Sequence, residues 1–322
     1  MQSKILGRTG LELSIVGLGT AFSGMRTIKE AQASYEALVS GIDEELGVQT
    51  VQAAIESGCT LIDTAALYGG GKAEEIIGHA LAERPDLAQR CIVTTKTGRM
   101  IHGYDYSYDG VMREVEASLR RLRFSQLPVV YIHDPMGVPM EEVMGKDRAL
   151  GALRKLQDQG VVRFIGTAAD DPRVNVRYIE TGEFDAAVVP RAWSLINQFA
   201  LRGILPAAIK HNVGLVIATS LERGLLATGP QPDTVYYDRN YSPECQAHVG
   251  KIQQLCQAHH VPLLAVALQW VTRHPQVTTT IPGARFPDEA RANAEAATVA
   301  IPESFWGELE PLLRHFDDAS NF

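Results

Sequence analysis

The chain has few cysteines, and their spacing suggests neither ligands nor disulfides. Four occur in 322 residues, Cys59, Cys91, Cys245 and Cys256, without a C-x-x-C pair or another metal-type spacing. Cys59 and Cys91 stand in apolar surroundings, where a free cysteine usually fills core space. The first ten residues, MQSKILGRTG, lack the pattern of a signal peptide. We therefore expect no metal site and a reduced, cytoplasmic compartment.

Long apolar runs and long runs of one charge are also missing. No apolar stretch approaches the ~20 residues that a membrane-spanning helix needs. The formal net charge is −8, and no basic patch of the kind found in nucleic-acid binders stands out. Low-complexity segments are absent, so no disordered tail is expected. Neither a membrane nor a nucleic acid is therefore an expected partner.

Several nucleotide and metal motifs are absent as well. The sequence contains no G-x-x-x-x-G-K-[ST] loop and no H-E-x-x-H. The glycine-rich stretches VGLGTAFSG and YGGGKAEE do not fit the G-x-G-x-x-G spacing that follows the first strand of a doubly wound sheet. A doubly wound fold is therefore the weaker alternative for an α/β chain.

Eight short segments rich in Val, Ile and Thr alternate with segments of helical periodicity. They are nearly continuous in apolar residues, as strands buried on both faces of a parallel sheet are. The predicted strands cover residues 14–20, 60–65, 91–96, 128–133, 162–168, 184–190, 213–220 and 277–283. Eight such strands separated by helices predict an α/β fold, a single (β/α)8 TIM barrel over residues 1–322.

The two ends of the chain predict additions to this barrel. SKILGRTGLELS is expected to form an N-terminal β-hairpin that turns at residues 8–10 and closes the barrel bottom. An extra C-terminal helix is expected in IPESFWGELEPLLRHF. Among the other helices, Asp109 is the predicted N-cap of DGVMREVEASLRRLRF, and Gly58 and Gly160 are expected to end two more.

Ionisable side chains follow three of the predicted strands at their carboxyl ends. Asp63 lies near the end of the second strand and Tyr68 just after it, Lys96 ends the third and His133 ends the fourth. Each of the four also has a purely structural explanation. Asp63 could cap the next helix, Tyr68 could be a half-buried aromatic residue of a loop, Lys96 could be exposed to solvent, and His133 could be a hydrogen-bonded core histidine. A strongly apolar strand, however, rarely buries a lysine or an aspartate without a partner. We therefore predict that Asp63 and Lys96 pair inside the barrel mouth, where strand ends meet.

This group of side chains suits proton transfer to or from a carbonyl or alcohol oxygen. An unperturbed tyrosine titrates near ~10, and the Lys96 ammonium is expected to lower the pKa of Tyr68 by about 1–3 pH units. Tyr68 is then the candidate general acid–base, with Asp63 holding Lys96 protonated. His133 would donate a hydrogen bond to an oxygen on which negative charge develops. Glycines 69–71 would let the chain turn tightly into the next helix.

The order of these four residues, within IDTAALYG, VTTKTG and YIHDP, resembles the aldo-keto reductase superfamily. The likeness runs from LGRTGLELSIVGLGT to TIPGARFPDEARAN, and YDYSYDGV and HDP are most similar to the branch of D-threo-aldose 1-dehydrogenase, L-galactose dehydrogenase and pyridoxal 4-dehydrogenase. The resemblance implies a barrel that transfers hydride between a nicotinamide and a carbonyl or alcohol. It makes Tyr68 the acid/base, adjusted by Lys96 and Asp63, and makes His133 the residue that orients the substrate oxygen.

The resemblance also implies cofactor and substrate contacts. NADP is expected, with NAD as the alternative, because Arg285 could contact a 2′-phosphate, although Asp288 and Glu289 oppose it. Trp193 stands where many members have a tyrosine that stacks on the nicotinamide, and Thr167 stands where many have Ser-Asn. The other expected cofactor contacts are Gly19, Thr20, Thr219, Ser220, Leu221, Gly224, Gly283 and Asn293, and the expected substrate contacts are Phe22 and Tyr104.

The function predicted first is an NAD(P)-dependent oxidoreductase acting on an aldehyde or ketone, or on an aldose at its anomeric carbon. A catalytically weak, nicotinamide-binding regulatory barrel is an alternative, against which the intact set of four residues argues. A barrel isomerase or lyase is a third, and it would not need the loop at residues 282–293. Residues 23–46 are longer than the usual first loop of the family. An extension above the barrel mouth is expected to narrow substrate choice, with surface decoration as the alternative. Monomer and homo-oligomer both remain open.

Overall fold

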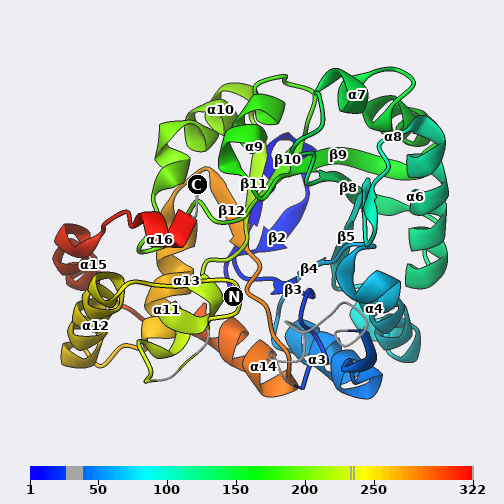
Figure 1. The fold of residues 1–322 in the computed structure, drawn as a ribbon. Helices are drawn as coiled ribbons and strands as arrows, with labels where there is room; N and C mark the ends of the chain where they lie inside the picture. The colour runs from blue at the N-terminus through cyan, green and yellow to red at the C-terminus, as the bar shows by residue number, and fades with distance from the viewer. Residues whose placement is uncertain (27–38, 233, 235, 321–322) are drawn as a thin grey trace.

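An eight-stranded parallel sheet forms the centre of the computed structural model, which describes residues 1–26, 39–232, 234 and 236–320 (Figure 1). The strands follow one another in the order β12-β11-β10-β9-β8-β5-β4-β3. Parallel bridges from Val16 to Thr280 and from Gly19 to Gly283 join the first strand to the last, so the sheet closes. Its strands are β3 (Leu18–Gly19), β4 (Leu61–Asp63), β5 (Ile92–Thr97), β8 (Leu127–His133), β9 (Val162–Ala168), β10 (Ala186–Val189), β11 (Gly214–Ile217) and β12 (Val277–Thr280).

The predicted (β/α)8 barrel is confirmed, and each strand overlaps its predicted segment. The first segment, 14–20, is divided, because Ser14 belongs to the N-terminal hairpin and only Leu18–Gly19 joins the barrel. The prediction for residues 23–46 falls largely on residues 27–38, which lie outside the described residues.

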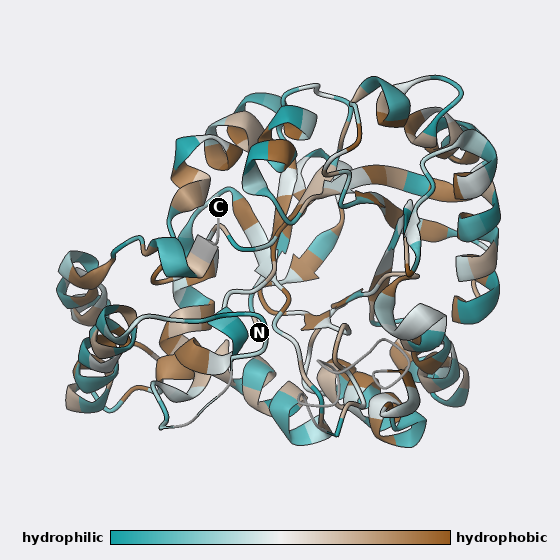
Figure 2. Cartoon of the chain, viewed as in Figure 1, coloured by the Kyte–Doolittle hydropathy of each residue, from teal (hydrophilic) through white to brown (hydrophobic). Residues whose placement is uncertain are grey.

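Alternate residues along each strand face either the barrel interior or the surrounding helices. Leu61, Val129 and Tyr131 pack together in the interior, whereas Ile62 and Val130 pack against the helices. Both faces of the strands are therefore buried, which explains their continuous apolar sequences. Figure 2 shows hydrophobic residues along the strands and hydrophilic residues on the outer faces of the helices.

Helices surround the sheet (Figure 1). The longer ones are α3 (Glu44–Glu56), α4 (Lys72–Glu83), α6 (Tyr108–Leu122), α8 (Ala149–Asp158), α9 (Pro172–Ile179), α10 (Ile204–His211), α12 (Pro243–Ala258), α13 (Leu263–Arg273) and α14 (Pro287–Ala296). The shorter ones are α5 (Pro85–Ala88), α7 (Glu141–Met144), α11 (Leu225–Thr228), α15 (Glu303–Leu309) and α16 (Asp317–Ser320). No helix in the described part of the chain is long and apolar enough to cross a membrane.

The helix ends agree with the sequence except at α6. Gly58 and Gly160 follow α3 and α8 with φ of 98° and 74°, in the left-handed region that favours glycine. The predicted Asp109 cap of α6 is wrong, because the Ser107 side chain accepts the N–H of Gly110 instead. Asp109 lies in the first turn, where its charge still favours the positive end of the helix dipole.

The predicted hairpin closes the bottom of the barrel. Its strands are β1 (Ser3–Ile5) and β2 (Glu12–Ser14), and a short 3₁₀ turn joins them. Lys4 Nζ donates to the backbone oxygens of Thr272, His274 and Val277 at 2.5, 3.3 and 3.0 Å, near the start of β12. Leu6, Leu11 and Leu13 complete the interior cluster from below. At the other end of the chain, Phe305, Trp306 and Leu309 of the predicted extra helix α15 are buried.

One glycine inside β9 makes room for the ring beneath the barrel mouth. A Cβ at Gly166 would lie 2.2 Å from the Tyr131 ring. We expect Gly166→Ala to lower the free energy of unfolding by about 1–3 kcal/mol, as measured by urea denaturation, because overpacking strains a filled core. Gly250 of α12 is the matched control, since an added Cβ there meets nothing within 4 Å. Wild-type stability of Gly166→Ala would show that the Tyr131 ring and the Ala186 backbone oxygen, 2.9 Å from the added Cβ, adjust without cost.

Candidate active site

Asp63, Lys96 and His133 stand at the carboxyl ends of the neighbouring strands β4, β5 and β8. Pairing between the strands sets Asp63 opposite Thr94 and Lys96 opposite Tyr131. Because Leu61 and Tyr131 face the interior, Asp63 and His133, two residues further along the same strands, face it too. All three side chains therefore gather on the inner side of the barrel mouth.

The predicted pairing of Asp63 with Lys96 is confirmed. Lys96 Nζ lies 2.5 Å from Asp63 Oδ2 and also donates to the backbone oxygen of Thr64 at 2.8 Å. The Thr94 hydroxyl donates to Asp63 Oδ1 at 2.9 Å. Both charged side chains are only 2% exposed. Each charge thus has a partner and further hydrogen bonds, which is what a buried ion pair requires.

Tyr68 lies beside this pair, at the start of the 3₁₀ turn Tyr68–Gly71. The Lys96 Nζ atom stands 4.8 Å from the centre of the Tyr68 ring. Residues Gly69, Gly70 and Gly71 follow with φ of 57°, 63° and 94°, and α4 begins at the next residue. The predicted tight turn is confirmed, since three successive left-handed residues are accessible to glycine at little cost.

Charge and burial act on these groups in opposite directions. Burial raises the pKa of Tyr68, and the Lys96 ammonium lowers it by less. The predicted net lowering is therefore wrong for the protein alone, because the sequence did not show how far water is removed from the phenolate. Burial also lowers the pKa of Lys96, but the neighbouring Asp63 and Tyr68 together raise it more, so the net shift is upward. Tyr68 is thus protonated and Lys96 charged at neutral pH.

His133 faces Tyr68 across the mouth. The two rings meet edge to face, with centroids 6.0 Å apart and an interplanar angle of 85°. Burial lowers the pKa of His133 well below its usual value, and the cations Lys96 and Arg99 lower it further. The imidazole is therefore neutral and suited to donate one hydrogen bond. The Tyr106 hydroxyl holds the end of β8 by donating to the His133 backbone oxygen at 2.6 Å.

Two predicted nicotinamide contacts face away from the mouth. The Trp193 ring stacks on Trp270 at 4.7 Å and its N–H donates to the Val271 backbone oxygen at 3.0 Å, in the layer between sheet and helices. The Thr167 hydroxyl approaches Asn175 of α9 at 3.4 Å. Both predictions are wrong, because Ala168, not Thr167, occupies the inward position of β9 and Trp193 folds outward after β10.

The first and last strands bring other predicted residues together. The Thr20 N–H and hydroxyl both donate to the Asp63 backbone oxygen at 3.0 Å, and Gly19 pairs with Gly283. A Cβ at Gly283 would lie 3.7 Å from the Phe22 ring, which contacts Tyr237 edge to face at 5.2 Å. These residues form one side of the mouth, next to Asp63.

The segment after β11 holds another four predicted contacts. The buried hydroxyl of Ser220 accepts from Thr280 at 2.7 Å, and the partly buried Leu221 packs against two hydrophobic clusters. Thr219 and Gly224 have φ of 63° and 102°. Glu222 and Arg223, between them, are also left-handed, with φ of 46° and 54°. Such a run of unfavourable conformations is more frequent at ligand sites than elsewhere.

Arg285 lies before the amino terminus of α14, as predicted, but Glu289 engages it. The guanidinium and the backbone N–H of Arg285 each donate to the Glu289 carboxylate at 2.8 Å. Its guanidinium also lies 4.8 Å from the Phe286 ring centre. Asn293 donates to the Gly283 backbone oxygen at 3.3 Å, which ties α14 to the mouth.

Sequence reasoning missed two charged residues beside His133. Arg99 follows β5 and pairs with Asp134, the residue directly after His133. The Asp134 carboxylate lies 3.7 Å from His133 Nε2. The only signal in the sequence was the position of Asp134 in YIHDP. Tyr104, a predicted substrate contact, pairs with Arg99 across the hairpin of β6 (Arg99–Met100) and β7 (Gly103–Tyr104) and is 48% exposed.

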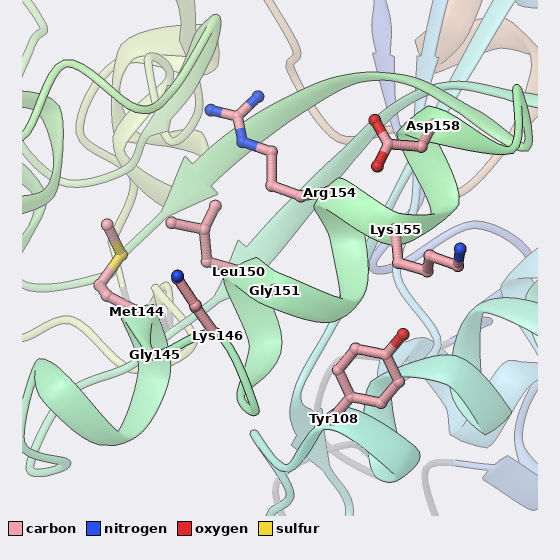
Figure 3. Close-up of a pocket in the computed structure, with 9 residues that line it drawn as sticks. All are labelled: Tyr108, Met144, Gly145, Lys146, Leu150, Gly151, Arg154, Lys155 and Asp158. Carbon is pink, nitrogen blue, oxygen red and sulfur yellow. The ribbon is translucent and has the colours of Figure 1, made fainter.

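A separate hollow of about 320 Å³ lies on the outer helices (Figure 3). Tyr108 of α6 and Leu150, Arg154 and Lys155 of α8 are among the residues that line it. None of the predicted site residues lines this hollow. It is therefore distinct from the mouth, where Asp63, Tyr68, Lys96 and His133 meet.

Comparison with known proteins gives one consistent result. The model of the aldo/keto reductase family matches residues 17–314. The chain is 28% identical to pyridoxal 4-dehydrogenase of Microbacterium luteolum over 96% of each chain. It is 26% identical to D-threo-aldose 1-dehydrogenase of Pseudomonas sp over 93% of this chain and 94% of that one. The solved glycerol dehydrogenase AKR11B4 of Gluconobacter oxydans aligns at a TM-score of 0.78 and 26% identity, covering 97% and 94% of the two chains.

Proposed function

The chain belongs to the aldo/keto reductase family and is an oxidoreductase, and we propose that it uses NAD(P) to interconvert an aldehyde and an alcohol, or an aldose and its lactone. The observation that carries the proposal is the buried Asp63–Lys96 pair beside Tyr68, with a neutral His133 opposite. Its relatives that act on pyridoxal and D-threo-aldoses support an aldehyde or aldose as substrate.

Each of the four side chains has one role in this proposal. A bound nicotinamide supplies or accepts the hydride. During reduction, His133 donates a hydrogen bond to the carbonyl oxygen, and Tyr68 transfers its proton to that oxygen as charge develops. Lys96 stabilises the phenolate that remains, and Asp63 keeps Lys96 charged and in place. Oxidation of an alcohol or a lactol runs through the same groups in reverse.

The described residues fit a dinucleotide in the mouth. The amino terminus of α14 has no side-chain cap, so its N–H groups are suited to a phosphate. Gly283, close to this amino terminus, is exposed. The segment with left-handed residues that follows β11 is close by, because β11 is the neighbour of β12 in the sheet. We propose that Gly19, Thr20, Phe22, Leu221, Gly224, Gly283, Arg285 and Asn293 lie along the cofactor or the substrate.

A regulatory barrel that binds nicotinamide with little catalysis is the second candidate. Loss of absorbance of NADPH or NADH at saturating aldehyde, or its gain with aldoses and the oxidised cofactors, separates the two candidates. Turnover supports the oxidoreductase. Tight cofactor binding without turnover on a broad panel of aldehydes and sugars would support the regulatory barrel. Absence of cofactor binding would contradict both candidates and would favour an isomerase or lyase.

We propose NADP as the preferred cofactor, with NAD as the alternative. A charged contact to phosphate contributes roughly 1.5–3 kcal/mol, so Arg285→Ala should weaken NADPH binding about 10–100-fold and NADH binding much less. Glu289 holds the guanidinium in the protein alone, so Glu289→Gln should strengthen NADPH binding relative to NADH. Fluorescence titration of each variant with both cofactors measures these effects.

The matched control for this cofactor test is Arg291→Ala. Arg291 lies on α14, the helix that follows Arg285, and pairs with the exposed Asp288 at 3.0 Å, so both affinities should be unchanged. Equal losses of NADPH and NADH affinity in Arg285→Ala would contradict the role of Arg285. Tighter binding of NADH by the wild type would assign Glu289 to a ribose hydroxyl instead.

A further inference from the structure

Asp134 has a backbone conformation that turns its side chain into the mouth. In a continuous strand, the side chains of His133 and Asp134 would point to opposite faces. Asp134 instead has φ of 48°, a left-handed value that aspartate adopts more readily than most residues. Its carboxylate consequently comes within 3.7 Å of His133 Nε2. Two successive side chains thus face the same space.

The surroundings hold this carboxylate in one orientation. Asp134 Oδ1 accepts the N–H of Asp170 at 2.8 Å, and the Asp134 N–H donates to the Ala168 backbone oxygen at 2.6 Å. The other oxygen, Oδ2, pairs with Arg99. The Asp134 side chain is 7% exposed and that of Arg99 is 36% exposed. Arg99 is therefore the more accessible member of the pair, and the Asp134 carboxylate is nearly buried beside it.

The distance to His133 places this pair next to the reacting group. His133 Nδ1 is buried without a hydrogen-bond partner among the described residues, which leaves Nε2 to face the mouth. An oxygen bonded to Nε2 lies about 3 Å from it, and Asp134 Oδ2 lies 3.7 Å from the same nitrogen. A hydroxyl on the carbon beside the reacting carbon lies two bonds from the reacting carbon. When that carbon points to the side of His133 on which Asp134 lies, its hydroxyl comes within reach of Asp134 and of Arg99, which pairs with it.

The charges around this point favour a neutral hydroxyl group. A hydroxyl can donate to the Asp134 carboxylate and accept from the Arg99 guanidinium. An anionic group would meet Arg99 but also Asp134 and Asp170. Arg191 already pairs with Asp170 at 2.8 Å, so two carboxylates offset the two guanidinium groups. A methyl group would make no hydrogen bond with either member of the pair.

We infer that Arg99 and Asp134 recognise a hydroxyl on the carbon next to the reacting carbon. The preferred substrates are accordingly 2-hydroxy aldehydes and aldoses. This inference rests on the proposed function. It adds two specificity-determining residues to the four proposed catalytic residues, and it names the substrate group that the two residues bind.

The test compares lactaldehyde with propanal, which differ only in the 2-hydroxyl group. For the wild type, kcat/KM should be about 10–100-fold higher for lactaldehyde, the range expected of a charge-assisted hydrogen bond. Asp134→Asn should lower this ratio about 10-fold, because asparagine keeps the shape and tolerates the left-handed backbone but lacks the charge. Arg99→Gln, on the half-exposed hairpin, should lower the ratio in the same direction. Comparing ratios between variants cancels the different hydration of the two aldehydes.

The matched control is Asp86→Asn. Asp86 also pairs with an arginine, Arg84 at 2.8 Å, but at the start of α5, before β5. The lactaldehyde-to-propanal ratio of this variant should equal that of the wild type. Cofactor affinity and melting temperature, measured for every variant, show whether the mouth is intact.

Four results would overturn the inference. Equal losses for both aldehydes in Asp134→Asn would mean that Asp134 only positions His133. A wild-type preference for glyoxylate over lactaldehyde would make Arg99 an anion site. Turnover of both aldehydes without preference would overturn this inference while leaving the proposed function intact. Turnover of no aldehyde or sugar with either cofactor would overturn the proposed function, and this inference with it.

Discussion

Replacing Tyr68 by phenylalanine is expected to lower kcat about 10²–10⁴-fold, the contribution typical of general acid–base catalysis. The phenylalanine ring can keep the contacts with His133 and with the Lys96 ammonium, whose nitrogen lies 4.8 Å from the ring centre. Only the transferable proton is lost. Steady-state kinetics should therefore show the fall in kcat, while titration should show little change in NADPH affinity.

Tyr106→Phe is the matched control for this experiment. The Tyr106 hydroxyl donates to the His133 backbone oxygen, so its loss removes a hydrogen bond of the site but no reacting proton. We expect a much smaller fall in kcat than for Tyr68→Phe. More than half of the wild-type activity in Tyr68→Phe would show that another group transfers the proton.

The second large effect is expected from Lys96→Met, which should slow turnover and move its pH profile upward. Burial raises the pKa of Tyr68 and Lys96 opposes that rise, so removal of Lys96 leaves the pKa higher still. Reduction needs the protonated phenol and falls as pH rises through this pKa, so the fall should occur at higher pH. Oxidation needs the phenolate, so its rate rises as the pH passes this pKa. In Lys96→Met this rise should also occur at higher pH.

Lys96→Met should also destabilise the fold. It leaves the buried Asp63 carboxylate without its cation, and removal of one partner from a buried pair typically costs about 3–5 kcal/mol. The double variant with Asp63→Asn removes both charges and should recover part of this stability, measured by urea denaturation, but not the original pH profile. An unchanged profile in Lys96→Met would mean that Lys96 does not influence Tyr68. Titration of His133 should not change the rate near neutral pH in any of these pH profiles, because its pKa is well below the usual value.

The barrel and its central ion pair were predictable from the sequence for physical reasons. Strands buried on both faces must be apolar throughout, so eight such segments between helices indicated the closed parallel sheet. A lysine and an aspartate at the ends of neighbouring strands could be buried only if they paired. The glycines at 69–71 likewise indicated the left-handed turn that follows Tyr68.

Two errors, at Thr167 and Trp193, arose because the prediction depended on the direction of one side chain. Successive strand residues face opposite sides, so a displacement of one position moves a side chain out of the site. Thr167 was expected in the mouth, yet Ala168 is the inward residue and Thr167 contacts α9. Trp193 follows β10 through an irregular segment, and its packing on Trp270 depends on a helix almost 80 residues later in the chain.

The sequence by itself determined the fold class, the eight strand segments and the pairing of Asp63 with Lys96. These follow from local apolar patterns and from the cost of burying a charge without a partner. Only the tertiary structure decided that burial outweighs Lys96 at Tyr68, that Glu289 engages Arg285 and that Asp134 turns back toward His133. Each of these depends on distances between segments far apart in the chain, or on one backbone angle, and neither quantity is encoded in a local pattern.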